Sequence, residues 1–336
     1  MPRDHRGSPE ADSRLHSAER RRNILAAMPF RSGYVAIIGR PNSGKSTLVN
    51  SLVGRKVSIV TSKPQTTRNR IQGILNQPDA QIVLLDTPGL HRGGSALDRR
   101  MTQEITEALD GIDVLSLVVD ATQRFGRDDE AALRWTKRFD GPVFLLLNKI
   151  DRIEKPKLLP LMDFYSKQRD FAEIYPISGL KSRGLEELSR GWISRLPENP
   201  PFFPPDQYTD QPERFLAAEI IREKAIRATR EEIPYAIAVF TENFEESDKL
   251  IRIRATLHVE REGQKGILIG KAGAMMKKIG SEARHELETL LGAKVFLELI
   301  VKVLPNWRED PAVIRRLDWR RQLEEMAEGA EDEGES

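Results

Sequence analysis

The sequence predicts an α/β domain followed by a smaller α+β domain. From residue 33 to residue 196, apolar runs of strand length alternate with helical patterns, which is typical of a parallel sheet covered by helices. Six prolines then fall from Pro197 to Pro212, and proline disfavours both helices and central strands. The element order changes after them. We therefore expect a stiff linker over residues 197–212 and a second domain over residues 213–308.

The individual elements follow from the period of the apolar residues. In the first domain we expect strands at Tyr34–Ile38, Gln81–Leu85, Asp113–Val119, Val143–Leu147 and Glu173–Ile177. In the second domain we expect a helix at Glu213–Ala228, strands at Tyr235–Phe240, Leu250–Arg261 and Lys294–Val303, and two helices around Gly270–Gly273. Residues 1–32 are polar with mixed charge, and we expect a disordered extension there. Residues 309–336 form a C-terminal segment whose last thirteen residues carry seven acids and no base, which predicts a solvated acidic tail.

Composition excludes several classes of protein. Hydrophobic residues make up 39% of the 336 residues, which is enough for two cores. No run of eighteen or more apolar residues occurs, so we expect no membrane-spanning helix. The chain has no cysteine, which excludes disulfides, thiolate metal sites and a cysteine nucleophile, and which fits a cytoplasmic protein.

A phosphate-binding loop is predicted directly after the first strand. The segment Gly39-Arg40-Pro41-Asn42-Ser43-Gly44-Lys45-Ser46-Thr47 contains the Walker A pattern, and a helical pattern opens at Ser46. Its glycines let backbone N–H groups surround phosphate oxygens, Lys45 supplies positive charge to the β- and γ-phosphates, and the Ser46 hydroxyl is a ligand for Mg²⁺. The start of the helix adds the positive end of its dipole. We expect all nine residues to contact the nucleotide.

Two further segments follow predicted strands and identify the nucleotide as a guanine nucleotide. The Asp86-Thr87-Pro88-Gly89 segment, continued by Leu90, places a carboxylate where it holds Mg²⁺, usually through water, and places the Gly89 backbone N–H near the γ-phosphate. The Asn148-Lys149-Ile150-Asp151 segment places a carboxylate that accepts hydrogen bonds from two guanine donors, a pair that adenine does not present. A backbone N–H at Ser178, after another apolar run, is expected to reach the guanine carbonyl.

Segments around these motifs resemble the Era family of bacterial GTPases. Residues 61–74 resemble the switch I segment of that family, residues 86–91 resemble switch II, and residues 259–273 resemble part of its C-terminal domain. The similarity covers about residues 33–308 in the family's order. It implies a P-loop NTPase domain of the TRAFAC type followed by a type II KH domain. The guanine-contact loop reads Ser178-Gly179 where the family usually has Ser-Ala, a mild change because the contact is made by backbone.

The resemblance also implies the roles of the switch residues. Switch I must hold a threonine that closes on Mg²⁺ and the γ-phosphate, and the resemblance favours Thr67, with Thr66 as the alternative. It implies Ser46, Thr67 and Asp86 as metal-site residues, and Lys45, Thr67 and Gly89 as catalytic residues.

Leu90 stands where Ras-like proteins have a water-orienting glutamine, so we expect slow intrinsic hydrolysis. In related GTPases an asparagine at the position of Asn42 helps to bind K⁺, which makes K⁺ a candidate cofactor. A plain turn asparagine is the alternative.

The second domain is predicted to bind RNA. Gly270-Lys271-Ala272-Gly273 is a G-x-x-G loop between two helical patterns, and such loops in KH domains clamp about four nucleotides of a single strand. Positive side chains around the loop supply the salt-dependent attraction to phosphates. The candidate RNA-binding residues are Lys265, Gly270, Lys271, Ala272, Gly273, Lys277, Lys278 and Arg284.

The Era resemblance implies that GTP and GDP control the grip on RNA. The implied RNA is the 3′ region of 16S rRNA and the implied role is maturation of the 30S ribosomal subunit, with no DNA partner. It also implies peripheral association with the inner membrane besides the cytoplasm. Three other functions stay open: an RNA-binding scaffold with negligible nucleotide turnover, a GTPase that serves an RNA-modifying enzyme, and a P-loop metabolic kinase. Multiple-turnover hydrolysis would exclude the scaffold.

Overall fold

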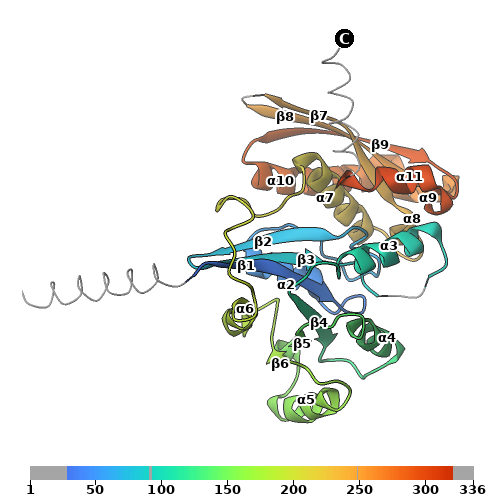
Figure 1. The fold of residues 1–336 in the computed structure, drawn as a ribbon. Helices are drawn as coiled ribbons and strands as arrows, with labels where there is room; N and C mark the ends of the chain where they lie inside the picture. The colour runs from blue at the N-terminus through green and yellow to red at the C-terminus, as the bar shows by residue number, and fades with distance from the viewer. Residues whose placement is uncertain (1–28, 91–92, 248, 321–336) are drawn as a thin grey trace, which may run out of the picture.

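The computed structural model describes residues 29–90, 93–247 and 249–320. The acidic tail, His91 of the predicted switch II segment and most of the predicted N-terminal extension lie outside the described residues. Two sheets organise the chain, one in each predicted domain, and helices of the second domain lie between them (Figure 1). No helix in the described part of the chain is long and apolar enough to cross a membrane.

The first domain has a six-stranded sheet in the order β2-β3-β1-β4-β5-β6. Its strands are β1 (Arg31–Ile38), β2 (Ile71–Gln77), β3 (Ala80–Asp86), β4 (Val114–Asp120), β5 (Val143–Asn148) and β6 (Glu173–Pro176). Helices α2 (Lys45–Val53) and α6 (Leu185–Ile193) pack on one face through one apolar cluster. Helices α3 (Ala96–Glu107), α4 (Arg127–Thr136) and α5 (Leu158–Ser166) cover the other face. The α/β prediction is confirmed.

The predicted parallel sheet carries one further strand, which was not predicted and is antiparallel. Strand β2 pairs with β3 in the antiparallel direction, although the five expected strands are present and pair in parallel. The sequence of β2 mixes polar and apolar residues without a clean alternation, and it belongs to a segment that the motifs marked as a switch. Only pairing with β3 identifies it as a strand.

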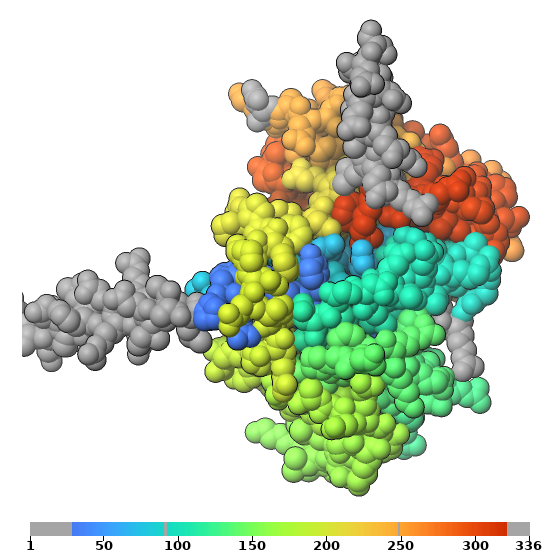
Figure 2. Space-filling view, in the orientation of Figure 1, coloured from blue at the N-terminus to red at the C-terminus, as the bar shows by residue number. Residues whose placement is uncertain are grey.

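The proline-rich segment packs along the edge strand β2. The carbonyl of Tyr208 accepts a hydrogen bond from the Ile74 N–H at 2.9 Å, and the Thr209 hydroxyl donates to the Gln72 carbonyl at 2.7 Å. Earlier in the proline-rich segment, the Phe202 ring stacks on Tyr34 of β1, with 5.1 Å between ring centroids. These contacts cover polar groups that an edge strand otherwise exposes. In Figure 2 the yellow surface of this region lies against the blue and green first domain.

The second domain has a three-stranded sheet in the order β7-β8-β9. Its strands are β7 (Ala238–Ser247), β8 (Leu250–Val259) and β9 (Lys294–Val303), and β9 is parallel to β8. Helices α7 (Glu213–Ala228), α9 (Glu262–Ile269) and α10 (Ala274–Leu291) share an apolar core with this sheet. The predicted element order is therefore confirmed, including α7 and β9 at their predicted bounds.

Two predicted boundaries of the second domain are wrong. The strand expected from Tyr235 begins at Ala238, because the short helix α8 (Ile233–Ala236) comes first. Pro234 fits the first turn of this helix, where a missing N–H costs no hydrogen bond. The next strand ends at Val259 rather than Arg261, since Arg261 precedes α9 as its N-cap residue.

The two domains share a further apolar cluster. Leu97 and Met101 of α3 pack with Phe240 of β7 and with Trp307. Val313 and Ile314 of α11 (Pro311–Arg316) join the same cluster. Trp307 is fully buried, and its indole N–H donates to the Ala236 carbonyl at 2.7 Å. Apolar packing of this kind gives the two domains a defined relative position.

Candidate functional site

The loop between β1 and α2 is held tightly by neighbouring strand ends. Gly44 has φ of +99°, and a Cβ atom there would lie 2.3 Å from Nδ2 of Asn148. A Cβ atom at Gly39 would lie 2.3 Å from the Val118 carbonyl oxygen. Gly89, from the β3 end, packs against Pro41 so closely that a Cβ atom would lie 2.8 Å from its Cα. Larger residues at these three positions would displace the loop.

Lys45 is buried beneath this loop. Its Nζ donates to the carbonyls of Gly39 at 3.1 Å and Arg40 at 3.2 Å. Burial lowers the pKa of Lys45 to about 8, and the charge of Asp86 offsets part of this effect. A phosphate group beside Nζ would raise that pKa again, because an anion favours the protonated amine. The geometry suits a lysine that becomes firmly charged when phosphate is present.

Three oxygen-bearing side chains lie at the foot of the loop. Asp86 is fully buried, and burial raises the pKa of its carboxyl although the Lys45 charge opposes the shift. Its Oδ2 accepts from the Ser58 hydroxyl at 2.8 Å, whereas its buried Oδ1 has no hydrogen-bond partner within the described residues. The hydroxyl oxygens of Ser46 and Thr67 lie 3.0 Å apart.

The two candidate threonines of switch I face different ways. The Thr66 hydroxyl lies 2.6 Å from that of Thr61 and donates to the Lys63 carbonyl at 2.7 Å, so it serves the loop itself. Only Thr67 of the pair faces Ser46 across the site. The resemblance favoured Thr67 with Thr66 as the alternative, and in this loop conformation only Thr67 lies next to Ser46.

Switch I also contacts the second domain. Arg222 of α7 donates to the Thr66 carbonyl, and Arg68 donates to the Ile237 carbonyl at 2.7 Å. Nearby, Glu223 accepts from the Val60 N–H at 2.8 Å and from Lys56 at 2.6 Å. The segment that reaches the phosphate-binding loop through Thr67 is therefore bound to α7 on its other side.

The predicted guanine-contact segment is braced by Asn148. Its Nδ2 donates to the Ser43 carbonyl at 2.9 Å, and its Oδ1 accepts from the N–H groups of Lys149 at 2.8 Å and Gly179 at 2.9 Å. One side chain thus joins three loops. Asp151 accepts from the Ser178 hydroxyl at 2.6 Å, which orients its carboxylate. Ile150 begins the following 3₁₀ turn, Ile150–Arg152.

A pocket of about 500 Å³ lies between the phosphate-binding loop and switch I. Lys149, Arg152 and Leu180 close it at the predicted base end. The volume is in the range of small-molecule sites. Nine of the residues predicted to bind nucleotide or its metal line this pocket: Pro41, Asn42, Gly44, Lys45, Ser46, Thr47, Thr67, Gly89 and Lys149.

Some side chains predicted to contact nucleotide point into the protein instead. Arg40 reaches Asp129 at 3.2 Å, and the Thr87 hydroxyl donates to the Ile37 carbonyl at 2.8 Å. Leu90 is buried in the apolar core, and its backbone N–H donates a hydrogen bond to the Gly39 carbonyl at 3.1 Å. At these positions the side chain supports the loop.

Two residues of the site were missed in the sequence. Asp120 ends β4 and accepts from Lys149 Nζ at 2.7 Å, and that amine also donates to the Asn42 carbonyl at 2.6 Å. The signal was available, because Asp120 follows an apolar strand just as Asp86 and Asn148 do. Ser58, which binds Asp86, has no comparable local signal.

The G-x-x-G loop of the second domain is open at its second glycine, whereas a Cβ atom at Gly270 would lie 2.7 Å from Cβ of Met275. It runs from α9 to α10, with Gly270 at φ of +75° and Gly273 at φ of +77°. A Cβ atom at Gly273 would have no neighbour within 4 Å. Lys271, Ala272, Lys277, Lys278 and Arg284 are exposed, whereas Lys265 is half-buried and lies 3.7 Å from Glu262. The loop therefore presents backbone and positive charge to solvent.

Comparison with known proteins agrees with both halves of this description. Residues 34–149 match a family described as 50S ribosome-binding GTPase, and residues 232–308 match a family described as KH domain. The GTPase Era of Syntrophus aciditrophicus is 49% identical over 292 residues, which cover 86% of this chain and 95% of that protein. The chain belongs to the Era family of GTPases.

Solved Era structures extend the match to three dimensions. A crystal structure of Era in complex with MgGDPNP and nucleotides 1506–1542 of 16S ribosomal RNA has a TM-score of 0.84 at 43% identity. It covers 86% of this chain and 99% of that chain. A variant of Aquifex aeolicus Era bound to GDP.AlF4⁻ gives the same values. As an Era-family member the chain is a GTPase with a KH domain, which removes the alternatives of a non-hydrolysing scaffold and a metabolic kinase.

Proposed function

We propose that this GTPase binds the 3′ region of 16S rRNA through its KH domain and assists maturation of the 30S ribosomal subunit, with GTP setting the grip on RNA. The observation that carries the proposal is the double contact of switch I. Thr67 faces Ser46 of the phosphate-binding loop, while the neighbouring Thr66 carbonyl is bound by Arg222 of α7. A γ-phosphate that draws Thr67 inward therefore acts on a segment already attached to the RNA-binding domain.

The RNA assignment is supported by the open G-x-x-G loop and by the solved relative. That Era structure contains nucleotides 1506–1542 of 16S ribosomal RNA. Exposed Lys271, Lys277, Lys278 and Arg284 lie on or near the loop of this chain, as phosphate binding requires. Such a partner supports a cytoplasmic location as part of the proposal, and peripheral contact with the inner membrane is a second location that the Era resemblance implies.

The experiment compares RNA affinity in three nucleotide states. A fluorescent RNA with the sequence of the 16S 3′ end is titrated with full-length protein carrying GDP, a GTP analogue or no nucleotide. A scrambled RNA and a DNA of the same sequence serve as controls. We expect the tightest binding to the specific RNA with the GTP analogue, and reciprocal tightening of GTP by RNA. Equal affinities in all three states would refute the switch, and equal binding of the scrambled RNA would refute the RNA assignment.

Mg²⁺ is the proposed metal of the nucleotide site. The buried Oδ1 of Asp86 lacks a partner among the described residues, which fits an oxygen that binds a hydrated cation. Oxygen ligands next to each other around octahedral Mg²⁺ lie about 3 Å apart, given bonds of about 2.1 Å. The hydroxyls of Ser46 and Thr67 have this spacing, at 3.0 Å. When bound, Mg²⁺ neutralises phosphate charge, and Lys45 and Thr67 hold the phosphates in place.

We also propose K⁺ as a second cation for hydrolysis. Leu90 is buried and aliphatic, so it cannot orient water. Asn42 has a left-handed backbone with φ of +61°, and its Nδ2 donates to the Ser62 carbonyl at 2.8 Å. This hydrogen bond holds the Asn42 amide next to the Ser62 carbonyl at the pocket wall, and the Asn42 Oδ1 and that carbonyl oxygen are the groups that we propose as ligands of an alkali cation.

Single-turnover hydrolysis in matched K⁺ and Na⁺ buffers tests this role. We expect hydrolysis at least about 5-fold faster in K⁺, and Asn42→Ala should remove the difference while GDP affinity stays within about 2-fold. Equal rates of the parent in both salts would contradict the proposal.

A further inference from the structure

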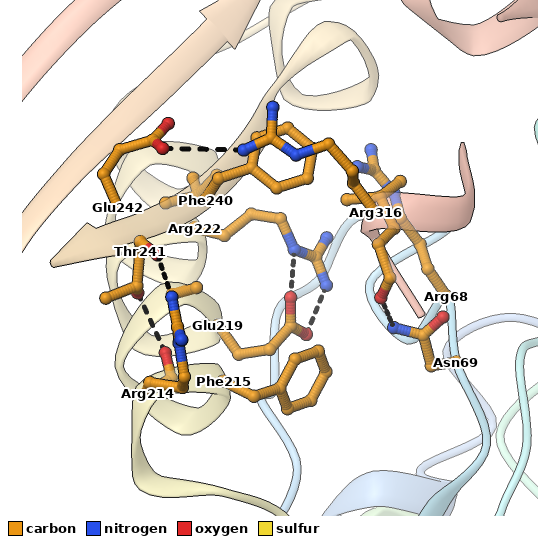
Figure 3. A pocket seen from close by; sticks show the side chains of 13 residues that line it. Arg68, Asn69, Arg214, Phe215, Glu219, Arg222, Phe240, Thr241, Glu242 and Arg316 are labelled. Atoms are coloured by element: carbon orange, nitrogen blue, oxygen red, sulfur yellow. Dashed lines mark hydrogen bonds and ion pairs between the residues drawn. The ribbon is translucent and has the colours of Figure 1, made fainter. Parts of the chain in front are cut away.

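A second pocket lies where the end of switch I meets α7, β7 and α11. Its volume is about 460 Å³, within the range of small-molecule sites. None of its lining residues lines the nucleotide pocket. Figure 3 shows the side chains that surround it, contributed by both domains. The GTPase and RNA-binding functions leave this pocket without a role.

Positive charge predominates in the lining. Arg68, Arg214, Arg222 and Arg316 contribute four charges, against two from Glu219 and Glu242. Glu219 and Glu242 already have partners, since Glu219 pairs with Arg222 at 2.6 Å and Glu242 pairs with Arg316 at 3.5 Å. The formal balance of four positive and two negative charges leaves an excess of two positive charges.

Arg222 lies in the middle of the pocket with donor capacity to spare. It is 1% exposed, and its Nε and Nη2 are engaged by the Glu219 carboxylate, as the dashed lines in Figure 3 show. Its Nη1 is buried and has no hydrogen-bond partner within the described residues. A buried, unsatisfied donor is costly, and a charged one more so. An acceptor entering the pocket would remove that cost.

Arg68 adds a second buried cation beside it. It is 4% exposed, and its two Nη atoms donate to the Ile237 and Tyr235 carbonyls. Its Nε is buried without a partner in the described part of the chain. Burial and then the charge of Arg222 lower the pKa of Arg68 well below its usual range. Two desolvated guanidinium groups that repel each other are an environment that favours an anion.

Apolar side chains also line the pocket, and Figure 3 shows Phe240 and Phe215 on opposite sides of Arg222. The apolar lining residues are Phe215, Ala218, Val239 and Phe240. The Arg316 guanidinium lies over the Phe240 ring, 4.4 Å from its centroid, at the more exposed rim. The apolar lining residues favour a planar apolar ring, and the arginines favour anionic oxygens.

We propose that this pocket binds a small organic anion in which a phosphate or carboxylate group is attached to a planar ring. The anionic group accepts hydrogen bonds from the unsatisfied nitrogens of Arg222 and Arg68, and the ring packs against apolar lining residues such as Phe215 and Ala218. Because Arg222 also holds the Thr66 carbonyl and Arg68 follows Thr67, the bound anion stabilises the end of switch I in the conformation seen here. Occupancy is therefore linked to the nucleotide state.

The test uses three probes: phenyl phosphate, benzoate and inorganic phosphate. Each is titrated into full-length protein saturated with GDP or with a GTP analogue, so that the nucleotide pocket is filled, and binding is followed by ligand-observed NMR. We expect phenyl phosphate or benzoate to bind with a dissociation constant of about 1 mM, ordinary for ligands of this size. Inorganic phosphate should bind about 10-fold more weakly because it has no ring. The better probe should have different affinities in the two nucleotide states.

Two arginines on the same short helix provide a matched pair of variants. Arg316→Gln removes a positive charge from the pocket lining and should lower the affinity for the ring-bearing probe about 3- to 10-fold. Arg315→Gln removes an equal charge from an exposed residue outside the lining and should change the affinity less than 2-fold. Glu242→Gln should tighten binding about 2- to 5-fold, since it removes competing negative charge. Ala218→Leu fills the cavity and should abolish binding, with nucleotide affinity as the check on folding.

Several results would overturn the proposal. These are no saturable binding of any probe up to about 10 mM in either nucleotide state, or equal weakening by Arg315→Gln and Arg316→Gln. Binding of a probe to nucleotide-free protein but to neither nucleotide-saturated state would also overturn it, because it would place the probe in the nucleotide pocket. Equal probe affinity in the GDP and GTP-analogue states would refute the link to switch I. If Ala218→Leu fails to fold, the opposite signs expected for Arg316→Gln and Glu242→Gln decide the matter.

Discussion

The phosphate-binding loop and the KH loop both use glycine at positive φ, but the phosphate-binding loop is enclosed and the KH loop is exposed at Gly273. Gly44 of the phosphate-binding loop and Gly273 of the KH loop both adopt positive φ just before a helix. A side chain at Gly44 would meet Asn148 at 2.3 Å, whereas one at Gly273 would meet nothing within 4 Å. The first loop needs glycine for both space and conformation, and the second needs it for conformation and for access by a ligand.

Their lysines differ in the same way. Lys45 is buried, bound to two carbonyls and lowered in pKa to about 8, whereas Lys277 is exposed. A compact nucleotide is enclosed by a prebuilt loop, so one buried charge acts strongly. A strand of RNA must pass across an open surface, where each charge is screened by solvent, so several charges together provide the attraction to phosphate. The following predictions test how far this contrast holds, from the largest expected effect to the smallest.

Removing one lysine from each loop should have very unequal effects. Lys45→Ala should lower the affinity for both GDP and GTP at least about 100-fold, because it leaves phosphate oxygens without their buried charge. Lys277→Ala should leave nucleotide affinity unchanged and lower RNA affinity about 2- to 5-fold. Fluorescent-nucleotide and RNA titrations measure both. If Lys45→Ala lowered nucleotide affinity only as much as Lys277→Ala lowers RNA affinity, the buried lysine would not act more strongly than the exposed one.

An acidic side chain in the open loop should act on RNA alone. Gly273→Asp, at the glycine with no neighbour within 4 Å, adds bulk and negative charge where backbone must approach phosphate, and should lower RNA affinity about 100-fold. GTP affinity should stay within about 2-fold, since the loop lies outside the nucleotide pocket. Gly263→Asp, which adds a charge on the same domain at a glycine of ordinary φ, is the control and should cost far less RNA affinity.

Alanine at each glycine separates space from conformation. Gly44→Ala should destabilise the protein by about 2 to 3 kcal/mol and impair nucleotide binding, since strain from positive φ adds to the clash with Asn148. Gly273→Ala should cost only about 1 to 2 kcal/mol, from φ alone. Denaturant unfolding of both variants gives the difference. A larger loss from Gly273→Ala would mean that the KH loop is more enclosed than the structure shows.

The proline-rich segment between the two regions can be tested through Asp210. Burial raises the pKa of Asp210 to about 6, although Arg320 and Arg70 oppose the shift. A carboxyl whose pKa is higher in the folded state stabilises the protein below its unfolded pKa of about 4, and that stability is lost as pH rises through 6. The asparagine of Asp210→Asn does not titrate, so the stability of this variant does not fall in that pH range. The free energy of unfolding of the variant should therefore gain about 2 kcal/mol on the parent between pH 4 and pH 8.

Denaturant unfolding at several pH values measures this effect. Parallel pH profiles for parent and variant would show that Asp210 is solvated. The segment would then be less closely packed on the first domain than its hydrogen bonds with β2 indicate.

The sequence by itself determined the chemistry and the order of the elements. The Walker A segment, the strand-end aspartates and the G-x-x-G loop are local patterns, because each depends on residues close together in the chain. Helix α7 and strand β9 were predicted at their bounds for the same reason, since hydrophobic period and flanking residues are local signals.

Tertiary structure decided what depends on partners distant in the sequence. Strand β2 exists as a strand through β3, Thr67 rather than Thr66 meets Ser46, and residues 202–211 pack on the first domain. The contact of Arg222 with Thr66 spans 156 residues, and no spacing or motif indicates that these two residues meet. Side-chain and backbone groups that pair across such separations carry no periodic signal, so only the folded chain shows that switch I is joined to the RNA-binding domain.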